Sequence, residues 1–369
     1  MKINLIQHVP TPHIDEMIMS LTESGNTVEV WYFIGSRDSI YNTSNINIKG
    51  SLYGPKIDIN FLTNILKKKE EVIIITGWMN MNMILLNLLF SVTNTFYFYW
   101  TDKPSNTNLN KFKYFKRHVS TMILKYSNSK ILCVGITAIN YFIERRISPK
   151  KLINFPIYTN SKQIVCKEEK IIWRHNNYKI NKDVFLISAG SRLEYEKGYD
   201  LLIEAVSLIR KEYLKRIKII IMGEGSLKEN LSDLISKYNL ENNFIFSGWK
   251  SIDEYKEIVS NSDLFIHPAR HDSYGASIFA LAAGVPVIGS DGAGAVIDRV
   301  KHNFNGLIYD SNNITQLSHY ITSLFLNPLE VQRLSTNAFE DSKSHTPINY
   351  YNILKSLFHE NTIEKKSEA

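Results

Sequence analysis

The sequence predicts an α/β fold made of two doubly wound, Rossmann-like domains that face each other across a cleft. Three observations support this prediction. The chain has 369 residues, which is enough for two domains of ordinary size. Short apolar runs alternate with amphipathic helical patterns through both halves, as in parallel α/β sheets. A polar, charged segment at residues 161–182 separates the two series and is expected to connect the domains.

Residues 1–165 are expected to form the first domain. Apolar residues at 14, 17, 18 and 21 mark one face of a helix, and Gly25 stands where such a helix would end. The uninterrupted apolar run at 72–75 is typical of a parallel strand buried on both faces. The strands expected in this domain are residues 3–6, 28–34, 72–75, 96–100 and 131–134.

Residues 170–345 are expected to form the second domain, with the same alternation of strand and helix. Its expected strands are residues 184–188, 217–222, 244–247, 264–267 and 285–288. Its expected helices are residues 199–209 and 227–238, one after Gly275, and several from residue 311 onward. Residues 346–360 are expected to form a last helix, with return to the first domain as one option. Two α/β domains in tandem place the ligand site in the crevice between them, at the carboxyl ends of the strands.

Composition and charge exclude several classes of protein. Apolar residues make up 44% and charged residues 21%, so the chain is not disordered as a whole. The net charge of +7 permits contact with phosphate groups, nucleic acid or anionic lipid without choosing among them. Two cysteines, Cys133 and Cys166, are too few for a secreted disulfide scaffold or a four-cysteine zinc site, and they indicate the cytoplasm. The N-terminus does not resemble a signal peptide, and the apolar stretch at 79–92 is too short to span a membrane.

The loop after the strand at 184–188 carries the first candidate functional residues, Arg192 and Lys197. Loops at the carboxyl ends of parallel strands often carry function, and two cations there can bind an anionic group such as a diphosphate. The alternative is that both cations are solvated and paired with Glu194 and Glu196. The loop alone does not decide between these interpretations.

A second candidate is the glycine pair Gly223 and Gly225, which follows the strand at 217–222. It resembles the start of a dinucleotide-binding loop, but Lys228 occupies the third glycine position, and no acidic residue follows at the required distance. An NAD site is therefore poorly supported. A tight turn from strand to helix, with Ser226 as the helix N-cap, explains these residues at least as well.

The third candidate segment runs from His267 to Ser277. A strand ends there in a loop that holds Asp272, and Gly275 opens a helix. The free N–H groups and the positive dipole end of a helix N-terminus suit a phosphate group. Asp272 can accept hydrogen bonds from sugar hydroxyls; the alternative is that it caps an ordinary turn.

Six short motifs in the second half of the chain share one order and spacing with a known family. They are Arg192-Leu-x-x-x-Lys197-Gly198, Gly223-x-Gly225, Phe246-Ser-Gly248-Trp249, Pro268-x-x-x-Asp272-x-Tyr274-Gly275, Gly284-x-Pro286-Val287-Ile288 and Asn305-Gly306. In this the chain resembles glycosyltransferase family 4, the group 1 enzymes, which are retaining, use nucleotide-sugar donors and have the GT-B fold. The resemblance covers about residues 184–310, and residues 1–160 are similar in layout only.

The resemblance implies a nucleotide-sugar donor site in the second domain and an acceptor site in the first. Arg192 and Lys197 would neutralise the diphosphate leaving group, so no metal ion or other cofactor is expected. Asp272 stands at the position of the family's first glutamate, which contacts the transferred sugar. Further donor-binding residues would be Gly223, Gly248, Trp249, Ser273, Tyr274, Gly275, Ala276 and Ser277, with Gly248 and Trp249 beside the base. The acceptor would attack on the same face that the leaving group departs from, and the leaving phosphate would help to deprotonate it.

The first domain departs from the family pattern. Its opening loop, residues 8–13, lacks the glycine pair common in the family, and Asp102 follows the strand where many members carry a histidine. His8, His13 and Asp102 are the acceptor-side candidates. The alternative for each histidine is an ordinary solvated loop residue.

Residues 103–151 form a strongly basic segment, with 11 Lys and Arg residues against one acid, Glu144. Its apolar residues at helical spacing are Phe112, Phe115, Val119, Met122 and Tyr126. A basic amphipathic helix over 111–126 can lie on an anionic membrane surface. The alternative is a helix whose apolar face packs on the sheet. A lipid-linked acceptor, frequent in the family, favours the membrane, and no motif indicates nucleic acid.

The helix after the third candidate segment lacks the family's second glutamate, which binds the ribose hydroxyls. Counted forward from Asp272 its position is Ala280, and counted back from Gly284 it is Phe279, because the segment is one residue short. Neither side chain can accept a hydrogen bond. The side chains considered as replacements are Ser277 and Asp298.

The function expected from the sequence is that of a cytoplasmic glycosyltransferase, with a peripheral position on the inner face of the cytoplasmic membrane as an option. It would move a sugar from a UDP- or GDP-linked donor to a glycan or lipid-linked glycan. By resemblance, the setting would be bacterial surface polysaccharide synthesis, such as O-antigen, capsule or lipopolysaccharide. The alternative is a catalytically impaired GT-B protein that serves as a binding or partner subunit.

Overall fold

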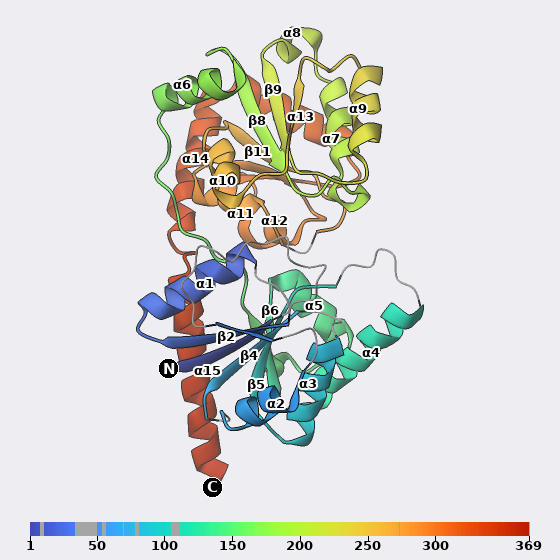
Figure 1. Ribbon diagram of the computed structural model, residues 1–369. Helices are drawn as coiled ribbons and strands as arrows, with labels where there is room; N and C mark the ends of the chain where they lie inside the picture. Colours follow the sequence, from blue (N-terminus) through green and yellow to red (C-terminus); the bar gives the residue numbers. More distant parts are fainter. Residues whose placement is uncertain are drawn as a thin grey trace. The chain divides into compact units, whose positions relative to one another are not determined.

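The chain divides into two compact units (Figure 1). Unit 1 combines Met1–Tyr158 with Pro347–Ala369, and unit 2 is Thr159–Thr346. The computed structural model describes residues 1–7, 11–33, 50–53, 57–68, 70–77, 81–104, 111–272 and 274–368.

Unit 1 is built around a parallel β-sheet. Within the described residues, its strand order is β3-β2-β1-β4-β5-β6-β7. The strands are β1 (Lys2–Gln7), β2 (Thr27–Phe33), β3 (Gly50–Tyr53), β4 (Val72–Thr76), β5 (Tyr97–Thr101), β6 (Ser129–Cys133) and β7 (Leu152–Asn154). Leu5 of β1 lies between Val30 of β2 and Ile74 of β4, and all three are buried. This order is that of a doubly wound dinucleotide-binding sheet.

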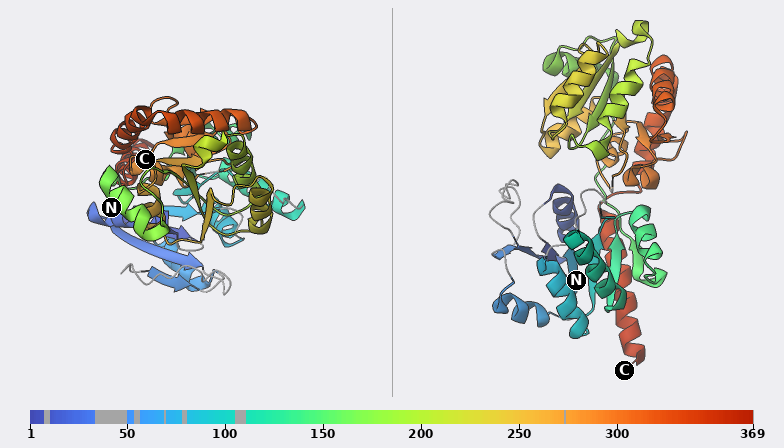
Figure 2. Two further views of the ribbon diagram at one scale, coloured as in Figure 1. Left: turned by 90° about the horizontal axis from the view of Figure 1, so that it is seen from above. Right: turned by 90° about the vertical axis from the view of Figure 1, so that its right-hand side faces the viewer.

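Helices flank the unit 1 sheet, and one of them comes from the end of the chain. The helices are α1 (Pro12–Glu23), α2 (Ile59–Leu66), α3 (Met81–Val92), α4 (Lys111–Tyr126), α5 (Ile136–Glu144), the short η1 (Pro149–Lys151) and α15 (Ile348–Glu368). α15 belongs to unit 1 and packs beside α1; Figure 2 shows it from two further sides. Tyr350 of α15 is fully buried, and its hydroxyl accepts a hydrogen bond from the Tyr158 backbone N–H at 2.8 Å. No helix in the described part of the chain is both long and apolar enough to cross a bilayer.

Unit 2 repeats the same sheet topology. Its strands, among the described residues, follow the order β10-β9-β8-β11-β12-β13. They are β8 (Phe185–Gly190), β9 (Ile217–Met222), β10 (Phe244–Gly248), β11 (Leu264–His267), β12 (Val287–Ser290) and β13 (Gly306–Tyr309). All of their pairings are parallel. The predicted fold class, an α/β protein with two doubly wound sheets, is confirmed.

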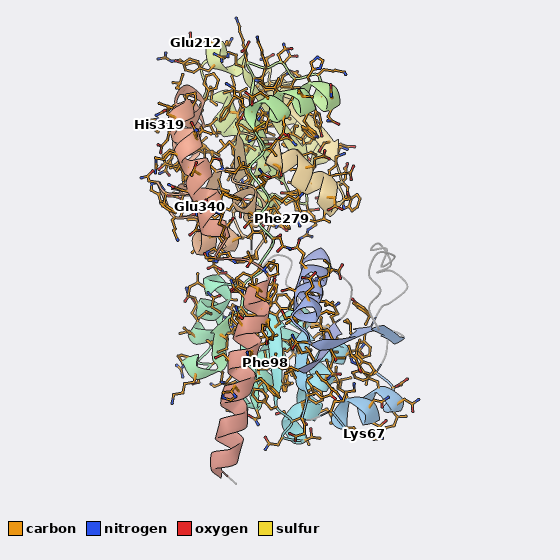
Figure 3. All side chains as sticks on the ribbon, turned by 90° about the vertical axis from the view of Figure 1, so that its left-hand side faces the viewer. Lys67, Phe98, Glu212, Phe279, His319 and Glu340 are labelled. Atoms are coloured by element: carbon orange, nitrogen blue, oxygen red, sulfur yellow. The ribbon has the colours of Figure 1, made fainter. Side chains whose placement is uncertain are left out.

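The unit 2 sheet is buried because its strands are apolar on both faces. Ile219 and Ile221 of β9 face one core, while Ile220 faces the other. The flanking helices are α6 (Lys167–Tyr178), η2 (Tyr195–Lys197), α7 (Tyr199–Ser207), α8 (Lys211–Leu214), α9 (Lys228–Lys237), α10 (Ile252–Ser260), α11 (Ser277–Ala282), α12 (Gly294–Arg299), α13 (Ile314–Leu326) and α14 (Pro328–Ser342). Figure 3 shows side chains packed through both units, with Phe98 of unit 1 and Phe279 of unit 2 labelled.

Residues 161–182 are not simply a polar connection, because residues 167–178 form α6. The sequence shows little periodicity there because polar contacts, together with the rings of Trp173 and Tyr178 rather than a regular apolar stripe, attach this helix to unit 2. Two guanidinium nitrogens of Arg174 lie 2.9 and 2.8 Å from the Asp263 carboxylate oxygens. The Lys170 ammonium donates to the Ser262 carbonyl at 2.7 Å. A search for apolar spacing alone therefore misses this helix.

Three strands also have no counterpart in the expected set. They are β3, β7 and β13, which have four, three and four residues. Short strands at a sheet edge need no continuous apolar run of the kind by which the central strands were recognised. All three lie at or next to a sheet edge, so the central strands that position the loops were the ones the sequence predicted.

Candidate functional site

The carboxyl ends of β8 and β11 meet in the middle of the unit 2 sheet. These strands are neighbours in the sheet although they are far apart in the sequence. The loops 191–198 and 268–276 leave the same sheet edge at the point where the strand order reverses, which is where open α/β sheets bind ligands. These loops hold Arg192, Lys197 and Asp272, the predicted catalytic residues.

Lys197 and Asp272 form a buried ion pair between the two loops. The Lys197 Nζ lies 2.7 Å from Asp272 Oδ1, and the two side chains expose only 11% and 8% of their surface. The other carboxylate oxygen, Oδ2, lies 3.0 Å from Nε2 of His267, the last residue of β11. Nδ1 of His267 lies 3.3 Å from the Ser277 hydroxyl. A line of polar contacts therefore joins Lys197, Asp272, His267 and Ser277.

These contacts keep Asp272 ionised. Burial by itself raises the pKa of this carboxyl, but His267 and the Lys197 ammonium outweigh it and lower the pKa to about 2. Both hydrogen bonding to the charged form and a nearby opposite charge favour the carboxylate. At neutral pH the loop after β11 therefore carries a fixed negative charge next to the Lys197 ammonium.

Arg192 lies on the same loop as Lys197 but in a different environment. Its side chain is 73% exposed, and its ion pair with Glu196 has an N–O distance of 3.9 Å. Exposed pairs of this kind contribute little to stability. Arg192 can therefore leave Glu196 for an anionic ligand at little cost, whereas Lys197 is held in place by Asp272.

Gly198 allows the two loops to approach each other closely. Its φ of +68° lies in the left-handed region, and a Cβ atom there would stand 2.1 Å from the Pro268 carbonyl oxygen. Gly223, after β9, brings the next loop equally close: its φ is +133°, and a Cβ would stand 2.0 Å from the Ser191 carbonyl oxygen. Only glycine fits such positions. Two of the motif glycines thus serve the packing of the loops that surround the site.

The turn after β9 differs from the expected one. α9 begins at Lys228 with Leu227 as its N-cap and without a side-chain cap, so the expectation that Ser226 is the N-cap is wrong. The reason is that Ser226 is held by Glu194 on the neighbouring loop. The Ser226 hydroxyl donates to Glu194 Oε2 at 2.8 Å, and its backbone N–H donates to Oε1 at 3.2 Å.

The two residues predicted to lie beside the base, Gly248 and Trp249, stand at the carboxyl end of β10. Gly248 has a φ of +72°, and its carbonyl accepts a hydrogen bond from the Gly223 N–H at 2.8 Å. Trp249 is exposed. Because β9 separates β10 from β8, these residues lie two strands away from the Arg192 loop along the same sheet edge.

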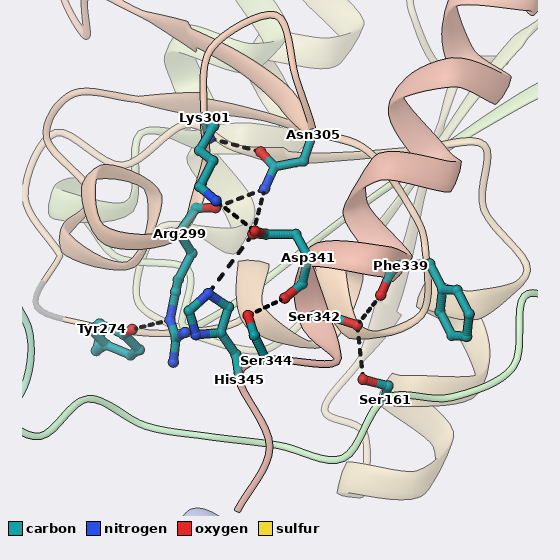
Figure 4. A network of polar contacts seen from close by, with 10 residues as sticks. All are labelled: Ser161, Tyr274, Arg299, Lys301, Asn305, Phe339, Asp341, Ser342, Ser344 and His345. Atoms are coloured by element: carbon teal, nitrogen blue, oxygen red, sulfur yellow. Dashed lines mark hydrogen bonds and ion pairs between the residues drawn. The ribbon is translucent and has the colours of Figure 1, made fainter. Parts of the chain in front are cut away.

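Tyr274 joins the loop after β11 to a polar network at the end of α14 (Figure 4). The Arg299 Nε donates to the Tyr274 hydroxyl at 2.8 Å, and Arg299 is buried. The Asn305 amide donates to the Arg299 carbonyl at 2.9 Å and is fully buried as well. Asn305 of the Asn305-Gly306 motif therefore has a structural role, because its amide fixes the backbone at Arg299.

Asp341 lies at the centre of this network (Figure 4). It accepts hydrogen bonds from the Lys301 ammonium at 2.6 Å and from the Asn305 amide at 3.1 Å. The His345 Nε2 lies 3.8 Å away. Burial and the charge of Arg299 lower the pKa of His345 to about 4, against the opposing effect of Asp341. His345 is therefore neutral at physiological pH.

The remaining predicted donor-binding residues lie around the start of α11. Ser277 is its first residue and is fully buried, while Gly275 and Ala276 just before it are half-buried. A Cβ at Gly275 would stand 3.4 Å from Asp272 Oδ2. Ser273 lies outside the described residues.

The two positions that correspond to the family's second glutamate are occupied by apolar residues that pack within unit 2. Ala280 is fully buried in the core of unit 2. The Phe279 ring packs against Tyr255 at a centroid distance of 5.9 Å, with the Lys256 ammonium 4.9 Å from its centroid. Ser277, one of the two replacements considered, lies within contact distance of His267. The other, Asp298, lies on α12.

The acceptor-side candidates of unit 1 are only partly placed. His8 lies outside the described residues, and His13 is described only as a backbone position in α1. Asp102 directly follows β5 and is half-buried. The acceptor-side assignment of these three residues therefore stays a prediction.

Two groups near the carboxyl end of β1 were missed by the sequence analysis. Asp15 lies in the first turn of α1, and burial raises its pKa to about 6. Burial also raises the pKa of Tyr32, near the end of β2, and the negative charge of Asp15 adds to this effect. An acidic residue in the first turn of the helix after β1 was the available signal for Asp15, but it is also a common helix-dipole feature. Among the described residues, no group of three or more His, Cys, Asp and Glu side chains is placed to hold a metal ion.

Comparison with known proteins points to one family. Residues 170–341, just under half of the chain, match the family model described as Glycosyl transferases group 1. In these residues the chain is similar to that family. The predicted resemblance to family 4 is thus confirmed, and the matched residues contain every motif on which that prediction depended.

The individual relatives of this chain are distant. The uncharacterized glycosyltransferase MJ1607 of Methanocaldococcus jannaschii is 30% identical over 147 residues, which are 39% of this chain and 37% of that protein. The O-antigen biosynthesis glycosyltransferase WclY of Escherichia coli is 26% identical over 236 residues, 63% of this chain and 62% of WclY. The alignments thus span less than two thirds of either relative.

The GT-B fold extends over the whole chain. The crystal structure of Alr3699/HepE from Anabaena in complex with UDP superposes with a TM-score of 0.78 at 15% identity, covering 97% of this chain and 99% of that one. The same protein has been solved with UDP-glucose, with a TM-score of 0.77. At this identity the comparison establishes the fold, and the predicted GT-B architecture is confirmed.

Proposed function

We propose that this glycosyltransferase moves a sugar, with retention, from a nucleotide-sugar donor to a glycan or lipid-linked glycan acceptor. One observation carries the proposal: the buried Lys197–Asp272 pair, closed by His267, lies beside the exposed Arg192 at the reversal point of the unit 2 sheet. The family match of residues 170–341 supports glycosyl transfer as the reaction, and this cluster supplies the side chains proposed to carry it out.

The donor's diphosphate would be held by the two cations of the loop after β8. Arg192 can turn from Glu196 to the phosphates and form charge-assisted, bidentate hydrogen bonds. Lys197 has three N–H donors, and its pairing with Asp272 fixes the ammonium where negative charge grows as the leaving group departs. Groups fixed before the reaction stabilise such charge without reorganising.

The transferred sugar would contact Asp272. A carboxylate has about four lone-pair positions, so one that faces Lys197 and His267 can still accept from a sugar hydroxyl. Gly275, Ala276 and Ser277 follow Asp272 closely in the sequence, at the start of α11. Gly223, Gly248 and Trp249 would border the nucleoside, and the UDP complexes of HepE favour uridine over guanosine as the first base to test.

The acceptor would be bound by unit 1, with His8, His13 and Asp102 as candidates. The printed function of WclY, O-antigen biosynthesis, favours a role in bacterial surface polysaccharide synthesis such as O-antigen, capsule or lipopolysaccharide. A lipid-linked acceptor would be met at the inner face of the cytoplasmic membrane. The proposal therefore includes a cytoplasmic protein that associates peripherally with this membrane through residues 111–126.

A nucleotide panel tests the donor assignment. Thermal unfolding should be measured with UDP, GDP and their sugars, since a ligand that binds the folded state at 100 times its Kd stabilises it by about 2.7 kcal/mol. One nucleotide should raise the Tm, and Arg192→Ala should reduce that shift. Release of the free sugar should then depend on the same nucleotide-sugar and increase with acceptor. No shift with any nucleotide would contradict the proposal.

The second candidate function is a catalytically impaired GT-B protein that acts as a binding or partner subunit. The observation that favours it is the absence of an acceptor group at Phe279 and Ala280, where the family binds the ribose. Two lost charged hydrogen bonds would weaken donor binding by about a hundredfold or more. Inserting a glutamate between these residues restores the family spacing but rotates part of α11 by about 100°.

The substitution Phe279→Glu tests the same idea without changing the helix register. It places a carboxylate near the Lys256 ammonium, at a half-buried position. If the native chain is impaired, this variant or the insertion should bind UDP more tightly and transfer faster. A native chain that turns over at about 1 s⁻¹ or more, with no gain in either variant, would contradict impairment.

A further inference from the structure

Helix α4 presents its apolar residues outward and its polar residues inward. Phe112, Tyr114 and Phe115 expose 64%, 64% and 62% of their surface. The residues of α4 that are buried are Arg117, Ser120, Thr121 and Leu124. The alternative in which the apolar face packs on the sheet is therefore not what the structure shows. In the part of unit 1 that the structure describes, the opposite side of the helix, with Phe112 and Phe115, is exposed.

The outward side chains form one stripe. At about 100° per residue, the five apolar positions of α4 fall within an arc of about 80°, opposite the buried face. These stripe residues are Phe112, Phe115, Val119, Met122 and Tyr126. Lys111 and Lys125 flank the stripe on one side and Lys116 on the other, by the same helical geometry. The Lys116 ammonium lies 4.5 Å from the Phe112 ring centroid.

A basic groove runs along one flank of this stripe, between α4 and the C-terminal end of α5. It has a volume of about 620 Å³ and is lined by Arg117, Lys125, Arg145 and Arg146, with Glu144 as its one acidic residue. His118 and Met122 line it too, so the groove borders the stripe directly.

One cation of the groove, Arg145, stacks on an aromatic ring. The Arg145 guanidinium lies 3.5 Å from the Tyr141 ring centroid, and its Nη1 donates to the Tyr141 carbonyl at 2.9 Å. Burial raises the pKa of the Tyr141 hydroxyl, and the positive charges of Arg145 and Arg117 oppose this rise. Arg117 lines the same groove as Tyr141 and Arg145. An arginine guanidinium group can bind two phosphate oxygens in a bidentate way.

The basic residues of the groove come largely from the C-terminal end of α5. The groove residues of α5 are Tyr141 and Glu144, and Arg145 and Arg146 follow that helix. On α4 the groove extends from Tyr114 to Lys125. None of these residues is among the acceptor-side candidates His8, His13 and Asp102.

We propose that the α4–α5 groove binds the phosphate group of an anionic phospholipid while the outward stripe of α4 inserts between the lipid head groups. This inference rests on the proposed membrane association of residues 111–126 and deepens it, because it assigns a headgroup site in addition to general attraction. The apolar stripe supplies contact with the upper acyl chains, and Arg145, Arg146, Lys125 and Arg117 surround the phosphate. Glu144 is the one acid to oppose them.

The test is co-sedimentation of the full chain with vesicles of phosphatidylcholine, alone or with phosphatidylglycerol. Wild-type protein should bind the mixed vesicles and not the neutral ones. The groove pair Arg145→Gln with Arg146→Gln should weaken binding by about 30-fold, since each basic residue contributes about fivefold at an anionic surface. The stripe pair Phe112→Ser with Phe115→Ser should abolish it.

A matched pair separates a headgroup site from diffuse attraction. Lys111→Gln with Lys113→Gln removes the same charge from the first turn of α4, outside the groove. At about 0.5 M salt, where diffuse attraction is screened, wild type and the Lys pair should retain binding and the groove pair should lose it. Equal losses in both pairs at both salt concentrations would overturn the headgroup site.

Two controls keep the outcomes distinct. Lys125 lines the groove, and Lys125→Gln leaves the contact between Arg145 and Tyr141 intact. This variant should therefore weaken vesicle binding even if the Arg145 variant is destabilised. Transfer to a soluble acceptor should be unchanged in every groove variant. Failure of wild type to bind anionic vesicles would overturn this inference and the membrane association together, while leaving the donor site untouched.

Discussion

Asp272 in unit 2 and Asp15 in unit 1 occupy comparable places, yet their pKa values move in opposite directions. Each follows a strand of a sheet with the same doubly wound order, at its carboxyl edge. Burial raises the pKa of Asp15 to about 6. Asp272 is more deeply buried, but His267 and Lys197 lower its pKa to about 2.

The difference teaches that one fold can provide two kinds of sheet edge. In unit 2, ion pairs and close backbone approaches fix the charged groups before any ligand arrives. In unit 1, the half-buried carboxyl of Asp15 near β1 has a pKa that burial raises. The first arrangement suits an anionic ligand such as a diphosphate, and the second suits uncharged hydroxyl groups. This agrees with the proposed division into donor and acceptor units.

The largest expected effect comes from breaking the ion pair of unit 2. Lys197→Met leaves Asp272 buried with only His267 beside it, and removal of one partner of a buried pair costs about 3–5 kcal/mol. Arg192→Ala is the matched control, because this exposed cation should change stability by less than about 0.5 kcal/mol. Urea unfolding of both variants checks this. Equally small losses of unfolding free energy in both variants would mean that the Lys197–Asp272 pair does not stabilise the carboxyl edge of the unit 2 sheet.

A glycine pair sharpens the comparison of the two units. Gly198 in unit 2 and Gly25 in unit 1 both have positive φ values, +68° and +78°, but only Gly198 has a backbone atom where a Cβ would be. Gly25→Ala should cost about 1–2 kcal/mol from its conformation alone. Gly198→Ala should cost about 1–3 kcal/mol more, because the loops must move apart. Similar losses in thermal unfolding would contradict the close approach.

The smallest effect is a difference in pH dependence. A carboxyl whose folded pKa is about 6 binds more protons when folded than when unfolded, for which the pKa is about 4. The stability attributable to Asp15 should therefore fall as pH rises from 4 to 6. Tm values of wild type minus those of Asp15→Asn should decrease over this range.

Asp272 provides the opposite case. Its folded pKa of about 2 lies below the unfolded value, so its contribution is present above pH 4 and is lost only as pH falls toward 2. The Tm difference between wild type and Asp272→Asn should thus stay constant between pH 4 and 6. A parallel slope for both aspartates would show that the two edges do not differ in this way.

The sequence was more informative for unit 2 than for unit 1, and the reason is physical. Gly198 and Gly223 were recognisable because close backbone approach admits no other residue, so such motifs recur. The central strands were recognisable because burial on both faces requires continuous apolar runs. α6 was missed because the Arg174–Asp263 ion pair and two rings, those of Trp173 and Tyr178, attach it without a regular apolar stripe.

Contacts between distant segments could not be predicted from the sequence. Nothing local indicates that Lys197 pairs with Asp272, or that Ser226 is held by Glu194 and so does not cap α9. The outward direction of the α4 stripe was equally hidden, because amphipathic spacing defines a face without saying what the face meets. In each case the sequence supplied the residues, and the arrangement of the strands decided their partners.

The central claim is that the loop after β8 holds the diphosphate of a nucleotide-sugar, and calorimetric titration tests it most directly. UDP, or GDP if the thermal panel selects it, should be titrated into wild type, Arg192→Ala and the control Arg210→Ala, an arginine that is 75% exposed near α8. The Kd should rise at least about tenfold in Arg192→Ala, because charged hydrogen bonds contribute about 1.5–3 kcal/mol, and should stay unchanged in Arg210→Ala. Equal Kd values in all three proteins would contradict the claim.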